Sequence, residues 1–163
     1  MVPVLFERQI AKMIESGNLE WAASELERKT SGSHKVNIRH ENLLAICHAK
    51  LGDLGKAEWL LSSALFHHPE DVRTLNNLGN VELLLGRTQT ALNLYKKAVV
   101  ADPFAKEPRY NMCLAYLQLG YFDKALYTYQ EYDLIRKYST IGKFVFFGAI
   151  AILISLFVYL ALA

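Results

Sequence analysis

Residues 80–99 read NVELLLGRTQTALNLYKKAV, and the same pattern occurs both before and after this stretch. Residues 48–65 (HAKLGDLGKAEWLLSSAL) and 114–132 (LAYLQLGYFDKALYTYQEY) align with it without a gap. The glycines that anchor the alignment, Gly52, Gly86 and Gly120, lie 34 residues apart. Self-similarity at this period predicts helix pairs that each stack on the next pair. The sequence therefore predicts an all-α solenoid.

The period divides most of the chain into three clear units at 38–71, 72–105 and 106–139. The first helix of each unit ends in Leu-Gly, and a glycine in this position is expected to adopt the left-handed conformation that stops a helix. The second helix begins within a few residues, which predicts an antiparallel hairpin. Pro69 and Pro103 close the first two units because proline cannot continue a helix.

A column of small residues (Ala45, Gly79 and Cys113) marks the first helix of each unit. Small residues let a neighbouring helix approach closely, so Cys113 is interpreted as a small buried hydrophobe. We expect Gly79→Leu to destabilise the array through overpacking, and Gly79→Ala to have a mild effect.

Residues 76–103 (NNLGNVELLLGRTQTALNLYKKAVVADP) resemble the tetratricopeptide repeat (TPR) family, and the resemblance extends over 38–139. Residues 1–37 are interpreted as a degenerate repeat, since Gly17, Leu19, Ala22 and Leu26 keep the family spacing. The resemblance implies a TPR-type α-solenoid with three clear repeats and one degenerate N-terminal repeat.

The resemblance also implies a partner-binding groove lined by the first helices. Its polar side chains include amides that can pair with an extended peptide backbone. The alternative is that the asparagines, Asn77 and Asn80 above all, pack or hydrogen-bond within the array. A clamp for a chaperone's carboxylate is disfavoured because Glu107 stands where a cation is needed. The predicted groove residues are Arg39, Asn42, Ile46, Lys50, Arg73, Asn76, Asn77, Asn80, Tyr110, Asn111, Leu114 and Gln118.

Residues 144–163 (FVFFGAIAILISLFVYLALA) contain no charge and are long enough to cross a bilayer as a helix, which we place at 141–163. Arg136, Lys137 and Lys143 precede this segment. The positive-inside rule then predicts a single-pass, tail-anchored protein with cytoplasmic repeats. A bacterial inner membrane is the favoured setting, and the surface of a eukaryotic organelle is the alternative.

A second surface is predicted near the end of the last unit. Tyr127, Leu134 and Tyr138 fall on one stripe of the last repeat helix, beside Glu131. TPR arrays usually end in a polar capping helix, and no such helix follows here. We therefore expect the stripe to be the uncovered end of the array, where a second subunit packs.

The remaining features exclude several classes of function. A net charge of +2 without a basic run gives no support for nucleic-acid binding. No nucleotide-binding or hydrolase motif occurs, and the histidines lack the acidic or cysteine neighbours of a metal site. We expect no enzyme activity, no cofactor, no metal and no small-molecule substrate. The predicted function is a scaffold for protein partners within a larger membrane complex of the secretion, pilus or motility type. A co-chaperone or organelle-surface receptor, or an accessory subunit of a membrane enzyme, is the alternative.

Overall fold

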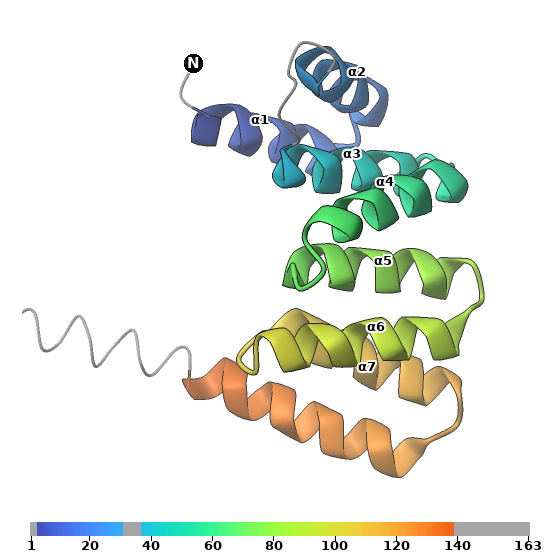
Figure 1. The fold of residues 1–163 in the computed structure, drawn as a ribbon. Helices are drawn as coiled ribbons and strands as arrows, with labels where there is room; N and C mark the ends of the chain where they lie inside the picture. Colours follow the sequence, from blue (N-terminus) through green and yellow to red (C-terminus); the bar gives the residue numbers. More distant parts are fainter. Residues whose placement is uncertain (1–2, 31–36, 139–163) are drawn as a thin grey trace, which may run out of the picture.

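The computed structural model describes residues 3–30 and 37–138, and every regular element within them is helical. The helices form a stack of antiparallel hairpins that runs from α1 and α2 at one end to residues 122–138 at the other (Figure 1). This confirms the predicted all-α repeat fold. The elements are α1 (Pro3–Glu15), α2 (Leu19–Thr30), α3 (Ile38–Lys50), α4 (Leu54–His67), α5 (Val72–Leu84), α6 (Thr88–Ala101), α7 (Lys106–Gln118) and a last described helix over 122–138.

One type of turn closes all four hairpins. Gly17, Gly52, Gly86 and Gly120 have φ values of 83°, 89°, 76° and 77°. The residue after each glycine donates its backbone N–H to the carbonyl five positions earlier, as in Arg87 to Glu82 at 2.8 Å. This Schellman arrangement satisfies carbonyls at the helix end, and only glycine adopts its backbone conformation without a steric penalty. The predicted left-handed stops are therefore confirmed.

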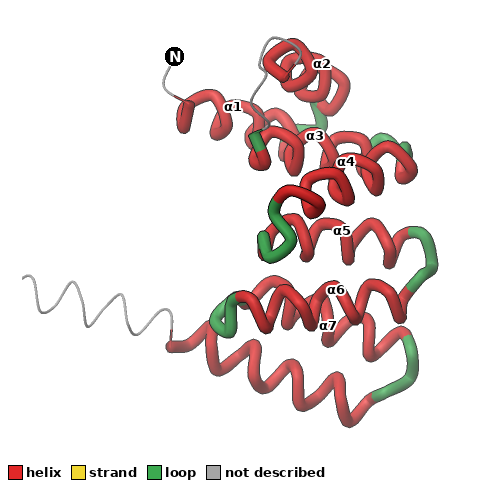
Figure 2. The backbone as a smooth tube through the Cα atoms, viewed as in Figure 1, coloured by secondary structure: helices red, strands yellow, loops and turns green. Residues whose placement is uncertain are grey.

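Aspartate caps fix the first turns of two helices. The carboxylate of Asp53, in the glycine turn between α3 and α4, accepts the backbone N–H of Lys56 at 3.1 Å. The carboxylate of Asp71, in the loop that joins the α3–α4 hairpin to α5, accepts the backbone N–H of Thr74 at 2.8 Å. Each bond satisfies a donor that the first turn of a helix would otherwise leave without a partner. Short loops connect the successive helices (Figure 2).

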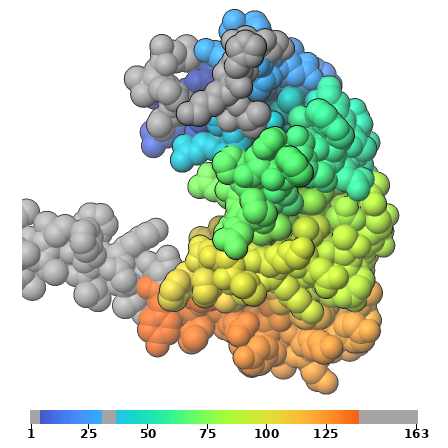
Figure 3. Space-filling view, viewed as in Figure 1, coloured from blue at the N-terminus to red at the C-terminus, as the bar shows by residue number. Residues whose placement is uncertain are grey.

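Apolar side chains fill the space between the stacked hairpins. One cluster joins α1, α2, α3, α4 and α5 around Ile10, Leu26 and Leu61, and a second joins α6 and α7 around Leu92 and Tyr95. Cys113 is buried in the second cluster, as predicted for a small hydrophobe, and burial raises the pKa of its thiol. Neighbouring hairpins therefore share apolar clusters. Figure 3 shows the successive segments of the chain as bands along the stack.

Gly79 corrects one expectation of the sequence analysis. A Cβ atom added there would lie 2.3 Å from Cε1 and 2.8 Å from Cδ1 of Tyr95 on the partner helix. The Tyr95 ring is fully buried, so it has little room to move. Close approach at Gly79 is thus observed, but the predicted mildness of Gly79→Ala is wrong because even one methyl group overlaps the ring.

The predicted membrane helix at 141–163 lies outside the described residues. Among the helices within 3–30 and 37–138, none combines the length and the apolarity that a bilayer crossing requires.

We expect Gly79→Ala to lower the free energy of unfolding by ~1–3 kcal/mol, because overpacking outweighs the gain in helix propensity. Gly55→Ala is the matched control: it is also helical, and nothing lies within 4 Å of its added methyl group. That change should stabilise the protein by roughly 0.5–1 kcal/mol. Urea unfolding followed by circular dichroism measures both.

A second substitution tests the stated cause. The preceding unit has Ala45 and Leu61 where this unit has Gly79 and Tyr95. Gly79→Ala should therefore cost less stability in a Tyr95→Leu background than in the wild type. An equal cost of Gly79→Ala in both backgrounds would contradict the overlap with the ring.

Candidate protein-binding groove

Two adjoining cavities lie along the first helices of the hairpins. The first, about 350 Å³, has mainly apolar walls and includes Ile46, Leu61 and Leu84. The second, about 310 Å³, is more polar and lies between α5, α7 and the last described helix. Asn80 lines both cavities, so together they form one groove across α3, α5 and α7.

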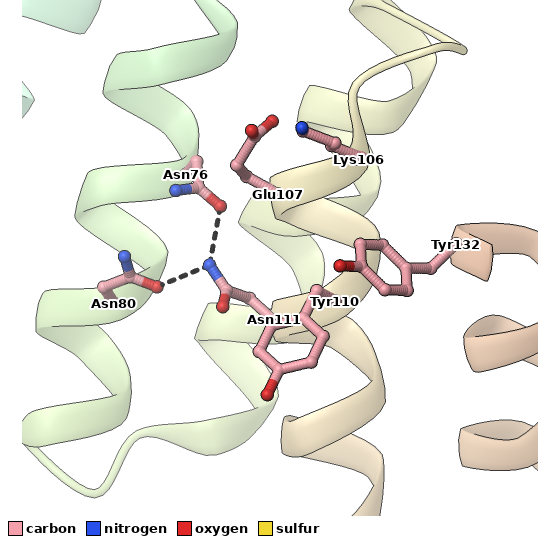
Figure 4. A pocket seen from close by; sticks show the side chains of 7 residues that line it. All are labelled: Asn76, Asn80, Lys106, Glu107, Tyr110, Asn111 and Tyr132. Atoms are coloured by element: carbon pink, nitrogen blue, oxygen red, sulfur yellow. Dashed lines mark hydrogen bonds between the residues drawn. The ribbon is translucent and has the colours of Figure 1, made fainter. Parts of the chain in front are cut away.

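Side-chain amides connect the helices that line the second cavity (Figure 4). The Nδ2 group of Asn111 on α7 donates to Oδ1 of Asn76 at 2.9 Å and to Oδ1 of Asn80 at 3.0 Å, both on α5. The hydroxyl of Tyr95 donates to the same Asn80 oxygen at 2.8 Å. These bonds fix the orientation of all three amides.

A related network lies deeper, between α3 and α5. Asn42 is buried, and its Nδ2 donates to Oγ1 of Thr74 at 2.7 Å, while its Oδ1 accepts from Nδ2 of Asn77 at 2.7 Å. The Thr74 hydroxyl donates in turn to the capping carboxylate of Asp71 at 2.7 Å. The network thus ties the N-terminus of α5 to α3, and the burial of Asn42 gives it a structural role rather than a partner-binding one.

The amides of the second cavity keep hydrogen-bonding capacity within the described part of the chain. Asn76 and Asn80 use their oxygens, which leaves their NH₂ groups as donors. Asn111 uses its NH₂ group, which leaves its carbonyl oxygen as an acceptor. Donors and an acceptor therefore border one cavity, as recognition of an extended backbone requires.

The predicted groove residues divide by position. Ile46, Lys50, Asn77 and Asn80 line the first cavity, and Asn76, Asn80, Tyr110 and Asn111 line the second. The others lie outside both. Arg39 is exposed and pairs with Glu7 on α1 at 3.2 Å, and Arg73 is exposed at the start of α5. Leu114 and Gln118 are exposed on α7.

Three lining residues of the second cavity were absent from the predicted set: Lys106, Glu107 and Tyr132. The Tyr132 ring packs 5.3 Å, centroid to centroid, from that of Tyr110 and forms one wall of the cavity. A sequence signal existed, because Tyr132 occupies the repeat position at which the earlier units have Ala64 and Ala98. A large ring in an alanine column indicates a local change in the groove.

The stripe of Tyr127, Leu134 and Tyr138 is exposed, as expected. Its interpretation as the uncovered end of the array is wrong, however. Phe66 and Val100 occupy the positions equivalent to Leu134 in the two preceding hairpins, and both are exposed although another hairpin follows them. The stripe therefore belongs to an outer side that every hairpin presents to solvent.

A comparison with known protein families identifies the family of this chain. A family model described as the bacterial transcriptional activator domain (BTAD) matches residues 48–137. The chain belongs to this family. The match covers every residue that lines the second cavity and all those that line the first except Ala45 and Ile46.

Similar proteins support the same fold. The crystal structure of MamA superposes with a TM-score of 0.70 at 16% identity, covering 83% of this chain and 78% of that one. A tetratricopeptide repeat protein from Parabacteroides merdae ATCC 43184 gives a TM-score of 0.63 at 23% identity, covering 77% and 50%. The BBSome complex member BBS4 of Bos taurus is 38% identical over 118 residues, which is 72% of this chain. The chain spans only 22% of that relative's length.

We expect Asn42→Ala to lower the free energy of unfolding by ~1–3 kcal/mol, because it removes the acceptor of the Asn77 amide and the donor to the Thr74 hydroxyl. Asn93→Ala, at an exposed position of α6, is the control and should change it by about 0.5 kcal/mol or less. Urea unfolding again provides the measurement. Similar effects for the two variants would show that the buried network contributes little.

Proposed function

We propose that the protein is a membrane-anchored scaffold whose groove binds an extended segment of a partner protein. The observation that carries the proposal is the row of fixed amides beside the second cavity. The side chains that carry these unused donors and this acceptor line a space of about 310 Å³ between α5, α7 and residues 122–138. Because the amides are held by hydrogen bonds before a ligand arrives, binding would cost little side-chain entropy.

The charges of the second cavity restrict the kind of segment it would accept. Lys106 and Glu107 have opposite charges and adjoin the same space. A uniformly acidic or basic peptide would meet repulsion from one of them. The proposed ligand is therefore an extended segment of mixed charge, with an aromatic or aliphatic side chain against Tyr110 and Tyr132.

The proposed anchor rests on the amino-acid sequence of 144–163. It has 20 residues without a charge, and Arg136, Lys137 and Lys143 precede it. The array would then lie on the cytoplasmic side. The bacterial family supports an inner-membrane setting, and a relative that is named as a complex member supports a role as a subunit of a larger assembly. A secretion, pilus or motility apparatus is the proposed kind of assembly.

The family description favours a second candidate, a part in activating transcription through protein contacts. Cell fractionation separates the two proposals. A scaffold with an inserted anchor stays with the membrane after extraction at alkaline pH. A transcription component without one is released with the soluble proteins.

The groove is tested with the full chain in lipid nanodiscs and peptides selected from a random phage-displayed library. Selected peptides should bind the wild type and the Asn93→Ala control equally. Tyr110→Ala combined with Asn76→Ala should lower the affinity for these peptides by roughly tenfold or more, because one wall of the cavity and one hydrogen-bond donor are lost. Peptides that bind this variant as tightly as the wild type would place recognition elsewhere.

The anchor is tested by placing two charges in its centre. Ile150→Asp with Ile152→Asp should release the protein from membranes, since each charge costs ~2.5–3.5 kcal/mol at the centre of a spanning helix. Leu134→Asp, in the described helix, is the control and should leave the protein bound. Reporter fusions at both ends determine orientation, and an N-terminus on the far side of the membrane would overturn the cytoplasmic assignment.

A further inference from the structure

The repeat register identifies the residues with which one hairpin contacts the next. On α6, Leu92 and Tyr95 are 1% and 0% exposed. They share an apolar cluster with Met112, Cys113 and Tyr116 of α7, which packs against α6. These α6 positions are therefore the contact surface for a following helix.

The last described helix has the same kind of surface without a cover. Leu126 and Tyr129 are equivalent to Leu92 and Tyr95, yet they are 60% and 45% exposed. Phe122, one turn earlier, is also exposed, and its equivalent Thr88 is buried. We call Phe122, Leu126 and Tyr129 the end face, because this helix forms one end of the stack (Figure 3).

The other end of the stack differs in chemistry. The exposed side chains of α1 include Arg8, Gln9, Lys12 and Glu15 as well as the apolar Leu5, and those of α2 include Glu20, Arg28 and Lys29 as well as Trp21. A mainly polar surface of this kind is typical of the end of a solenoid. It does not match the apolar end face, so head-to-tail stacking of two copies would bury charges against aromatic rings.

We propose that the end face binds an amphipathic α-helix of a partner protein, in the position that α7 occupies on α6. Leu126 and Tyr129 occupy the repeat positions with which α6 contacts α7. The side chains that α7 packs against α6 therefore indicate which side chains the partner helix presents. Its helix has a small residue at the place of Cys113, with larger apolar residues at the places of Met112 and Tyr116. Phe122, Leu126 and Tyr129 line neither cavity, and the Tyr129 ring lies 5.9 Å, centroid to centroid, from the Tyr132 ring in the groove wall. The inference does not depend on the groove or on the anchor.

The probe is a synthetic peptide with the sequence of residues 106–118, held helical by a hydrocarbon bridge between positions 114 and 118. Both positions are exposed on α7, so the bridge leaves the packing residues unchanged. Fluorescence anisotropy with the full chain in nanodiscs should show saturable binding, and a scrambled peptide with the same bridge should show none.

Two double variants locate the binding site. Leu126→Glu with Tyr129→Glu should lower the affinity for the peptide by roughly tenfold or more, because binding would bury carboxylates without partners. Tyr127→Glu with Leu134→Glu is the matched control on the outer side, and it should leave the affinity unchanged. All four residues are exposed, so circular dichroism should show native helicity in both variants.

Four results would overturn the proposal. The first is the absence of binding by the bridged peptide, and the second is equal loss of affinity in both double variants. The third is a concentration-dependent dimer in sedimentation velocity that the Leu126→Glu, Tyr129→Glu variant abolishes and the control variant does not, because a second copy would then occupy the end face. The fourth is crosslinking of a benzophenone amino acid at position 126 to residues of the same chain beyond 138.

Discussion

The α5–α6 hairpin depends on how closely its two helices approach, and a small residue opposite a large one sets that distance. Gly79 lies against the ring of Tyr95, and the equivalent positions hold Ala45 with Leu61 in the preceding unit. Between these two units the larger side chain is accompanied by the smaller partner, which keeps the packed volume similar. Because hairpins stack on one another, a change in one such contact shifts the surfaces of its neighbours as well.

The same contact positions the groove. The buried Tyr95 ring extends from the α5–α6 packing, and its hydroxyl reaches Asn80, which lines both cavities. Burial raises the pKa of Tyr95, so the phenol remains a proton donor at every physiological pH. The core therefore fixes the Asn80 carbonyl, and through Asn111 it fixes the amides on α7. The fold and the proposed binding site share these residues, which is why the groove variant has to be checked for its fold.

The sequence alone was sufficient to predict the helix pairs and their turns, because a 34-residue period and the Leu-Gly stops are local signals. It was insufficient at Gly79, where the effect of one methyl group depends on a ring 16 residues away. The sequence was also insufficient to predict that Asn42 is buried and does not line the groove, since groove and buried positions alternate within one helical turn. Tyr132 and Leu126 were detectable in principle: comparing each position with its equivalents in the other units reveals both, whereas helical periodicity within the last unit does not.

That comparison also separates two kinds of exposed apolar residue. Leu134 repeats a property of Phe66 and Val100, which are exposed in complete hairpins, so its exposure follows from the fold itself. Leu126 and Tyr129 differ from Leu92 and Tyr95 because no helix within the described residues packs over them as α7 packs over α6. Free ends of repeat arrays are usually polar, as α1 is for the most part, because exposed apolar faces promote association. An apolar residue at a position that the repeat normally buries is therefore the stronger indication of a contact.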